Sequence, residues 1–141
     1  MWQRFGPHDD GVAVLVEEEI RHSAELIVGI KRDVHFGRTV VVGVGGTEVE
    51  RTDVTMVDLL PIDEERLSDF LLGVGIDTGA VAPQAVSRIL NGLNAIMNSC
   101  ADIVEIEINP LVVDESAAAH RLVALDGVVV LRNVAHCDAS T

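Results

Sequence analysis

Residues 105–111 read Glu-Ile-Glu-Ile-Asn-Pro-Leu, and this stretch decides how the rest of the chain is interpreted. Its alternation of polar and apolar residues predicts a β-strand, because successive strand side chains point to opposite faces of a sheet. Glu105, Glu107 and Asn109 then share one face. Three oxygen-bearing side chains on one face form a ligand set that suits a hard divalent cation.

A second strand follows a polar, alanine-rich turn centred near residue 117, so the two strands predict a hairpin. Symmetric pairing about that turn places Asn109 opposite or nearly opposite Asp126, with β-carbons about 4.5–5.5 Å apart. Asp126 stands in the apolar run Ala124–Val128, where we expect an unpaired carboxylate to be unfavourable and a bound cation to remove that penalty. The alternative is a solvated acidic face, with Asp126 only closing a turn with Gly127.

The remaining apolar segments are short and bounded by turns, which is typical of strands. They predict strands at Gly11–Glu17, Glu25–Lys31, Thr39–Val44 and Thr52–Leu60, followed later by Asp102–Val113 and Arg121–Leu131. The first three are joined by short turns, and short turns favour antiparallel hairpins over helical crossovers.

Two helices are expected between the early and the late strands. Asp63 can cap the first, which ends at Gly73 and Gly75. The second extends from about Pro83 to Ser99, and its apolar residues recur at helical spacing. That stripe comprises Val86, Ile89, Leu90, Leu93, Ile96 and Met97, and we interpret Met97 and Cys100 as packing residues.

The expected architecture is α+β: a largely antiparallel sheet with two helices packed on one side. We expect an irregular lead-in over residues 1–10, one domain over 11–132 and a flexible tail over 133–141. The chain has 141 residues, 48% of them hydrophobic, which is ample for one core and argues against disorder.

The charge balance limits the partners. Ten Lys and Arg against 23 Asp and Glu give a net charge of −13, which argues against nucleic acid and anionic lipid as general partners, although the acidity could serve solubility alone. No apolar stretch approaches the roughly 18 residues that span a bilayer, and no signal peptide is evident. Two cysteines suggest no disulfide framework, so we expect a cytoplasmic protein.

Two further groups of residues could bind a ligand. Glu17 and Glu25 flank a short turn, and opposed like charges on paired strands call for a hydrogen-bond donor or a positive charge between them. Ribose hydroxyls or the exocyclic amine of a base would serve. The alternative is a pair splayed into water. The loop at 43–46, Gly-Val-Gly-Gly, follows a strand as phosphate-cradling loops do, yet it lacks P-loop and dinucleotide spacing and could be only a turn.

Taken together, these stretches resemble the ATP-grasp region of nucleotide-diphosphate-forming acyl-CoA ligases, which include acetate–CoA ligase (ADP-forming) and the succinyl-CoA synthetase β subunit. The resemblance extends from about Gly11 to Leu131. It rests on six stretches in the family's order: 14–18 (Val-Leu-Val-Glu-Glu), 25–29 (Glu-Leu-Ile-Val-Gly), 31–37 (Lys-Arg-Asp, then Phe-Gly), 45–50 (Gly-Gly-Thr-Glu-Val-Glu), 107–111 (Glu-Ile-Asn-Pro-Leu) and 125–127 (Leu-Asp-Gly).

The resemblance implies a role for each matching residue. Glu17 would lie on a hinge strand that reads adenine through its backbone, and Glu25 would take the ribose hydroxyls. Gly45 and Gly46 would border the nucleotide. Asn109 and Asp126, with Glu107 beside them, would hold Mg²⁺ against the phosphates of ATP or ADP. The partners implied are an upstream ATP-grasp lobe or a CoA-binding subunit, and exposed apolar surface predicts a homo-oligomer.

The chain also departs from the family pattern. The upstream lobe with its lysine and glycine-rich loop is not in this sequence, the family's arginine before Pro61 is lacking, and no phosphohistidine can be assigned. Three hypotheses therefore stand: a metal- and nucleotide-binding lobe of an ADP-forming acyl-CoA ligase, a degenerate non-catalytic ATP-grasp module for oligomerisation or partner binding, and a magnesium- or small-anion-binding protein of another fold.

Overall fold

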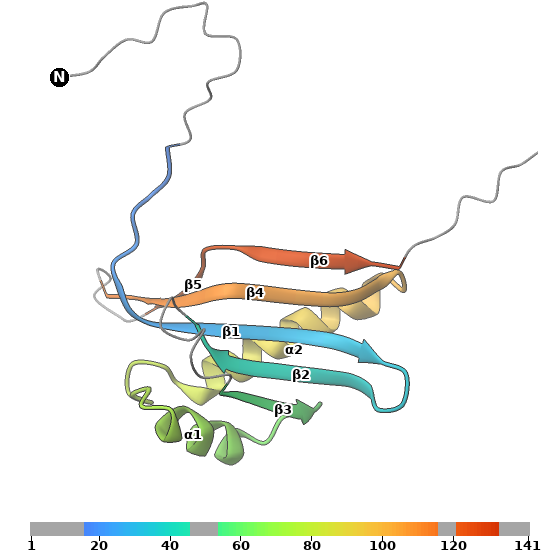
Figure 1. Cartoon of the computed structure of the whole chain (residues 1–141), viewed down its shortest axis with the longest axis horizontal. Coiled ribbons are helices and arrows are strands. Elements are labelled where there is room, and N and C mark those ends of the chain that lie inside the picture. Colours follow the sequence, from blue (N-terminus) through green and yellow to red (C-terminus); the bar gives the residue numbers. More distant parts are fainter. Residues whose placement is uncertain (1–15, 46–53, 116–120, 133–141) are drawn as a thin grey trace, which may run out of the picture.

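The computed structural model describes residues 16–45, 54–115 and 121–132, which form one sheet and two helices (Figure 1). In chain order the elements are β1 (His22–Asp33), β2 (Gly37–Val44), β3 (Thr55–Leu59), α1 (Glu64–Gly73), α2 (Pro83–Ser99), β4 (Ile103–Asp114), β5 (Arg121–Ala124) and β6 (Gly127–Leu131). The strands are ordered β3-β2-β1-β4, with β5 and β6 both pairing with the outer side of β4. Every described pairing is antiparallel, which confirms the α+β architecture.

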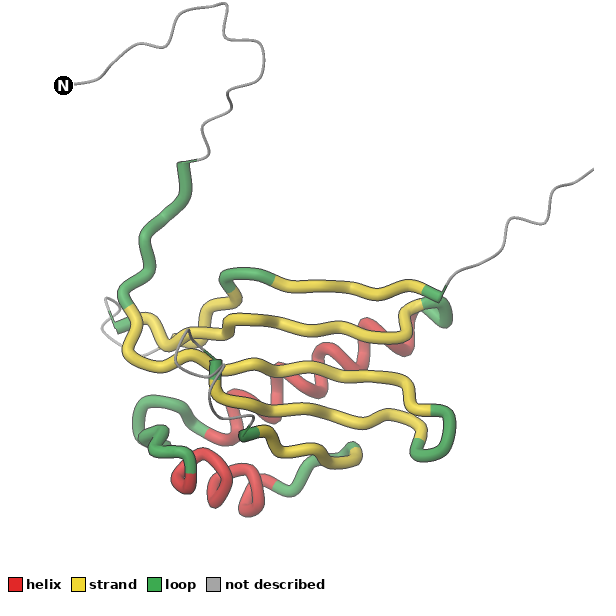
Figure 2. Tube along the Cα trace, in the orientation of Figure 1, coloured by secondary structure: helices red, strands yellow, loops and turns green. Residues whose placement is uncertain are grey.

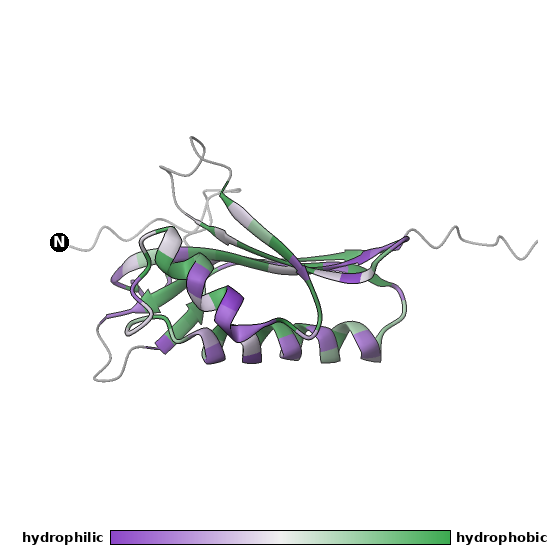
Figure 3. Ribbon diagram, turned by 90° about the horizontal axis from the view of Figure 1, so that it is seen from below, coloured by the Kyte–Doolittle hydropathy of each residue, from purple (hydrophilic) through white to green (hydrophobic). Residues whose placement is uncertain are grey.

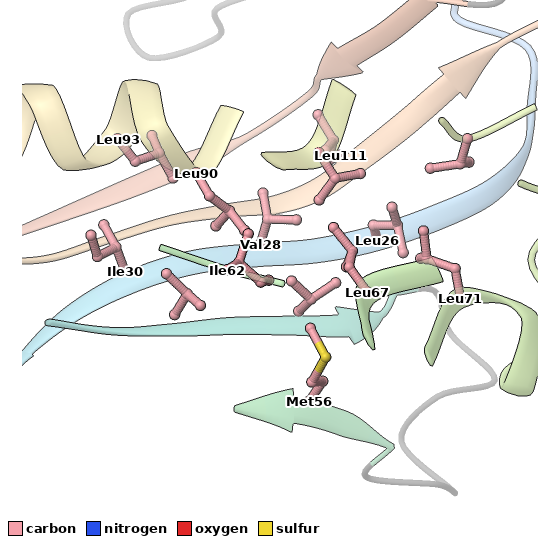
Figure 4. Close-up of a cluster of buried hydrophobic side chains, with 14 of the residues drawn as sticks. Leu26, Val28, Ile30, Met56, Ile62, Leu67, Leu71, Leu90, Leu93 and Leu111 are labelled. Atoms are coloured by element: carbon pink, nitrogen blue, oxygen red, sulfur yellow. The ribbon is translucent and has the colours of Figure 1, made fainter. Parts of the chain in front are cut away.

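Both helices lie on one side of the sheet (Figure 3). The core forms between them because alternate strand residues point toward the helices, as Leu26, Val28 and Ile30 of β1 do (Figure 4). The helices contribute Leu67, Leu71, Val86, Leu90, Leu93 and Met97. Met97 and Cys100 pack against this core as predicted, whereas Ile96 is 51% exposed, because consecutive helical residues point about 100° apart.

The other side of the sheet carries no helix, and we call it the open face. Strand register places on it Thr55, Val57 and Leu59 of β3, Thr39, Val41 and Gly43 of β2, Ile27, Gly29 and Lys31 of β1, Glu105, Glu107 and Asn109 of β4, and Val128 and Val130 of β6. The open face is therefore apolar toward β3 and acidic along β4.

The helix limits follow from local chemistry. Asp63 caps α1, since its carboxylate accepts the amide hydrogens of Glu65 at 2.9 Å and Arg66 at 3.4 Å. Gly75, with φ of +80°, terminates the turn after that helix. α2 extends from Pro83 to Ser99, as predicted. A proline suits its first position, because the first N–H groups of a helix have no intrahelical partner.

Arg32 joins the end of α2 to the sheet. Its guanidinium donates to the carbonyl oxygen of Met97 at 2.6 Å and to that of Ile103 at 2.8 Å. Carbonyls in the last turn of a helix lack intrahelical partners, and a cation suits the negative end of the helix dipole. Arg32 of β1 therefore caps a helix that begins 51 positions later in the chain, at Pro83.

Two strand predictions were wrong in their limits. Val16 and Glu17 lie before the sheet in a segment without regular secondary structure, while the rest of the predicted strand Gly11–Glu17 is outside the described residues. The predicted strand Arg121–Leu131 is two strands, β5 and β6, separated at Leu125 and Asp126 (Figure 2). The predicted lead-in and tail also lie outside the described residues.

Candidate functional site

Asn109 of β4 lies directly across from Asp126, which stands between β5 and β6. The amide of Asn109 donates to the carbonyl oxygen of Asp126 at 3.1 Å, and the amide of Leu125 donates to that of Pro110 at 3.0 Å. The ladders on either side, Leu111 with Ala124 and Ile108 with Gly127, keep one register through this point. The predicted juxtaposition of Asn109 and Asp126 is therefore confirmed as a backbone relationship.

Glu105, Glu107 and Asn109, which we call the acidic row of β4, make side-chain contacts of their own. The side-chain Nδ2 of Asn109 donates to Glu107 Oε1 at 3.4 Å, so these two side chains lie on the same face, as the alternation predicted. Glu105 forms an ion pair with Lys31 of β1, with 3.1 Å between Glu105 Oε2 and Lys31 Nζ. Among the residues that register places on the open face, Lys31 carries the positive charge, and it is already engaged with a carboxylate.

The environment of Asp126 differs from the expectation. Asp126 is exposed, and its Oδ1 accepts the amide hydrogen of Gly127 at 2.7 Å. The apolar neighbours in sequence do not enclose it, because β6 is an edge strand and its side chains face solvent. An exposed carboxylate carries no burial penalty, so the predicted relief of such a penalty by a bound cation was wrong.

The donor set fits a shared rather than an enclosed metal site. Within the described residues, no three His, Cys, Asp or Glu side chains gather closely enough to hold an ion. Glu107, Asn109 and Asp126 supply two carboxylates and an amide oxygen. Mg²⁺ is commonly held by one or two carboxylates together with waters and substrate phosphates, so these residues fit Mg²⁺ carried by a nucleotide.

Glycines flatten the open face beside the acidic row. Gly29 lies between Val41 of β2 and Glu107 of β4, and a β-carbon on Gly29 would approach the carbonyl oxygen of Ile106 to 3.2 Å. Glycine inside a strand is typical of places where a ligand or another backbone comes close. No role was predicted for Gly29, although a glycine within an apolar strand is a signal of such a close approach.

Glu25 does not pair with Glu17, contrary to the hairpin prediction. Glu17 is exposed in the segment before β1, while the Glu25 carboxylate accepts from His22 Nε2 at 2.8 Å. The other ring nitrogen of His22 lies 2.9 Å from the carbonyl oxygen of Ile20. These two hydrogen bonds, the one to Ile20 foremost, raise the pKa of His22, and Glu25 and Glu115 add to the effect by their charge.

The glycine loop is only partly described. The amide of Gly45 donates to the carbonyl oxygen of Glu25 at 2.7 Å, so that amide is engaged within the sheet. A β-carbon on Gly45 would approach Glu25 Cβ to 3.1 Å, which explains why a glycine stands there. Gly46 lies outside the described residues. Gly45 is thus brought beside Glu25, at the same end of the sheet.

A cleft of about 640 Å³ opens elsewhere, between the β1–β2 turn, the β3–α1 connection and α2. Its polar lining includes Arg32, Asp33, Arg38, Asn91 and Asn94, and Arg38 donates to Asn94 Oδ1 at 2.6 Å. Both arginines make hydrogen bonds with helix α2 or its side chains, and none of the lining residues belongs to the acidic row. We therefore assign these arginines to the attachment of α2.

The comparisons with known proteins identify the family of the chain. The family model described as ATP-grasp domain matches residues 2–131. The chain is 25% identical to 4-hydroxybutyrate–CoA ligase [ADP-forming] of Nitrosopumilus maritimus, over 77% of this chain and 17% of the relative. The chain thus spans about a sixth of that relative's length.

Solved structures show the same fold at low identity. The dinucleotide-forming acetyl-coenzyme A synthetase 1 of Ca. Korarchaeum cryptofilum, in complex with coenzyme A and Mg-AMPPCP, has a TM-score of 0.57 at 23% identity, over 79% of this chain and 55% of that one. Its apo form has a TM-score of 0.60 at 23% identity, over 82% and 57%.

A third structure, of a Pyrococcus horikoshii protein, has a TM-score of 0.57 at 21% identity, over 81% of this chain and 51% of that one. Within the described residues, neither helix is both long enough and apolar enough to cross a bilayer.

The family model covers nearly the whole chain, the curated relative is an ADP-forming ligase, and the sheet matches synthetase structures. The chain belongs to the ATP-grasp domain family, with homology to ADP-forming acyl-CoA synthetases.

Proposed function

We propose that this chain is the metal- and nucleotide-binding lobe of an ADP-forming acyl-CoA ligase, which converts ATP, a carboxylate and CoA into acyl-CoA, ADP and phosphate. The observation that carries the proposal is the opposition of Asn109 and Asp126, with Glu107 hydrogen-bonded to Asn109. The backbone register thereby places two carboxylates and an amide at neighbouring positions of a sheet face that no helix covers. Activity requires an upstream ATP-grasp lobe or a CoA-binding subunit.

Each residue has a role that its position supports. Asp126, Asn109 and Glu107 hold Mg²⁺ with the nucleotide phosphates. When bound, the ion neutralises charge on the phosphates during phosphoryl transfer. Gly29 keeps the neighbouring surface flat, so that the ligand can approach the backbone.

The other end of β1 receives the nucleoside. Glu25, a partly exposed carboxylate, accepts the ribose hydroxyls. Glu17 lies in the segment that enters β1, where its backbone can meet the adenine. Gly45 borders the same region, since its amide donates to the Glu25 carbonyl oxygen, and we assign the following Gly46, which lies outside the described residues, to the same loop. A carboxylate that accepts hydrogen bonds from two hydroxyls is a common way to recognise a ribose, because charge-assisted hydrogen bonds are the stronger ones.

The partners follow from what the relatives contain. The Korarchaeum structure was determined with coenzyme A and Mg-AMPPCP, and this chain spans 55% of it. The remaining parts of such an enzyme supply the second wall of the nucleotide site and the CoA site. We place the protein in the cytoplasm as a homo-oligomer without nucleic-acid or membrane partners, consistent with its net charge of −13.

Calorimetry tests the proposal. ADP is titrated into the chain mixed with a separately expressed upstream ATP-grasp lobe, with and without Mg²⁺. We expect a magnesium-dependent heat that Asp126→Asn abolishes and Asp102→Asn preserves, since Asp102 is an exposed aspartate just before β4. A wild-type complex that binds ADP equally well in a chelator would overturn the metal role of Asp126.

One observation favours a second function, that of a degenerate module retained for partner binding. Lys31 is the cation that register places on the open face, it is paired with Glu105, and the family's arginine is missing from Thr55–Leu60. Phosphate transfer depends on several such cations. This function predicts that Asp126→Asn leaves the affinity for the upstream lobe unchanged and that no ADP heat appears with any variant.

A further inference from the structure

Strand β6 is an apolar edge that the described chain leaves uncovered. It pairs with β4 on one side, and no described strand lies on its other side (Figure 1). Val128, Val129, Val130 and Leu131 are 40–60% exposed, so side chains on both faces of the strand meet solvent. Edge strands usually carry a charge, a proline or a bulge that prevents pairing with another chain. Gly127–Leu131 contains neither a charged residue nor a proline, and the irregularity in its pairing with β4 places the extra residue on β4, between Ile103 and Glu105.

The two ends of β6 bear opposite charges. Asp126 precedes the strand and Arg132 follows it. Neither side chain forms an ion pair with another residue of the described ranges, although five other such pairs occur there. An apolar strand between one acid and one base is self-complementary when it is turned end for end. The charge pattern therefore fits a second copy of the same strand.

We propose that the chain forms a two-fold symmetric dimer in which β6 pairs antiparallel with β6 of a second copy, about an axis at Val129. In this register Gly127 faces the partner's Leu131, and Val128 faces the partner's Val130. Asp126 then faces the partner's Arg132, and the symmetry repeats that contact. Such an interface is isologous and closes on itself, as most dimer interfaces do.

Several energies favour the pairing of two β6 strands, and one of them, the Asp–Arg contact, selects this register. Main-chain hydrogen bonds join the β6 edges of the two copies into one continuous sheet, a mode known as β-augmentation. The valine side chains lose solvent on both faces of the joined sheet. A shift by two residues retains these terms but removes both Asp–Arg contacts, and opposite charges across strands are favourable. The opposite edge, β3, suits pairing less well, because Asp58 stands inside it and binds Arg66 at 2.8 Å.

The β6 edge is our proposed site for the homo-oligomer of the proposed function. The dimer does not depend on nucleotide binding. Asp126 is also a proposed metal ligand, so the experiment is done in a chelator and without nucleotide. The readout is the molar mass of the full chain in sedimentation equilibrium across a concentration series. Loss of dimer would then leave the nucleotide proposal untouched, and loss of ADP binding would leave the dimer untouched.

The first comparison uses two matched lysine variants. Val129→Lys puts two like charges opposite one another at the axis, and we expect the dimer dissociation constant to rise about tenfold or more. Val57→Lys, at an equally exposed valine on the opposite edge (56% against 54%), should leave it within about twofold of wild type. A wild-type chain that stays monomeric throughout, or equal weakening by both variants, overturns the proposal.

The second comparison tests the register by charge reversal. Asp126→Arg and Arg132→Asp should each weaken the dimer, because each places like charges face to face across the interface. The double variant restores opposite charges and should return the dissociation constant to within about threefold of wild type. Failure of the double variant to recover overturns the register at Val129. All these positions are exposed, and circular dichroism checks that each variant is folded.

Discussion

The backbone nitrogen of Asn109 lies 3.1 Å from the backbone carbonyl oxygen of Asp126, and this hydrogen bond occurs between the end of β5 and the start of β6. β5 ends at Ala124 and β6 begins at Gly127, yet the register is the same on both sides of the gap. The two side chains are thus held on adjacent backbones without either being buried. A ligand can reach them without unfolding anything.

The exposed position of Asp126 leads to a prediction about stability. Asp126→Asn should change the free energy of unfolding by less than about 0.5 kcal/mol in a chelator, as surface substitutions usually do. Asp114→Asn should cost about 1–3 kcal/mol, because Asp114 is fully buried and accepts from Arg121 at 2.7 Å. Urea unfolding of both variants measures the difference. Equal losses would contradict the exposure of Asp126.

Two glycine-to-alanine changes should act in opposite directions. Gly37 ends the β1–β2 turn with φ of +81°, so Gly37→Ala should destabilise by about 1–2 kcal/mol. Gly92 lies inside α2 with open space where a β-carbon would go, so Gly92→Ala should stabilise by about 0.8–1 kcal/mol. Thermal melting of the two variants beside wild type should show shifts of opposite sign. A stabilising Gly37→Ala would mean that the turn is not left-handed.

Replacing Arg32 should loosen the end of α2. Arg32→Met removes both donors to the Met97 and Ile103 carbonyls, and we expect a loss of about 2–3 kcal/mol. Arg88→Met serves as the control, since Arg88 is exposed and its Nε donates to the carbonyl oxygen of Gln84 in its own helix, at 3.3 Å. Hydrogen exchange at the last turn of α2 should rise in the first variant alone. Unchanged protection there would remove the capping role.

His22 should make stability depend on pH. Its folded pKa is raised above the ordinary value of about 6.5, so its protonated form stabilises the fold. That stabilisation is complete below pH 6.5 and disappears as the pH rises through the raised value. We expect the stability difference between wild type and His22→Gln to shrink over that interval. A difference that grows with pH would contradict the hydrogen bonds to Ile20 and Glu25.

The sequence was most informative where local geometry decides the structure. The opposition of Asn109 and Asp126 could be predicted because a hairpin with equal arms pairs residues at a constant sum of positions. Asp63 and Pro83 marked helix starts, because capping and the missing proline donor act within one turn. These features depend on neighbours in the chain and not on packing.

Features that depend on distant parts of the chain could not be predicted. The exposure of Asp126 follows from β6 being the last strand of the sheet, which residues 124–128 alone do not reveal. Arg32 was a match in a short motif, and its contact with Met97, 65 positions away, required the folded structure. His22 joined Glu25 in place of Glu17, because the segment before β1 is not a strand.

The position of β1 at the centre of the sheet has a consequence for the order of folding. β1 meets β2 across a turn of only three residues, Val34–Phe36, so this hairpin closes a small loop with little entropy lost. Its other neighbour, β4, arrives after both helices, and the bond from Arg32 to Ile103 spans 71 positions. Contacts of such long sequence separation slow folding. The hairpin can therefore form first, and the rate of reaching the native state depends on the docking of β4.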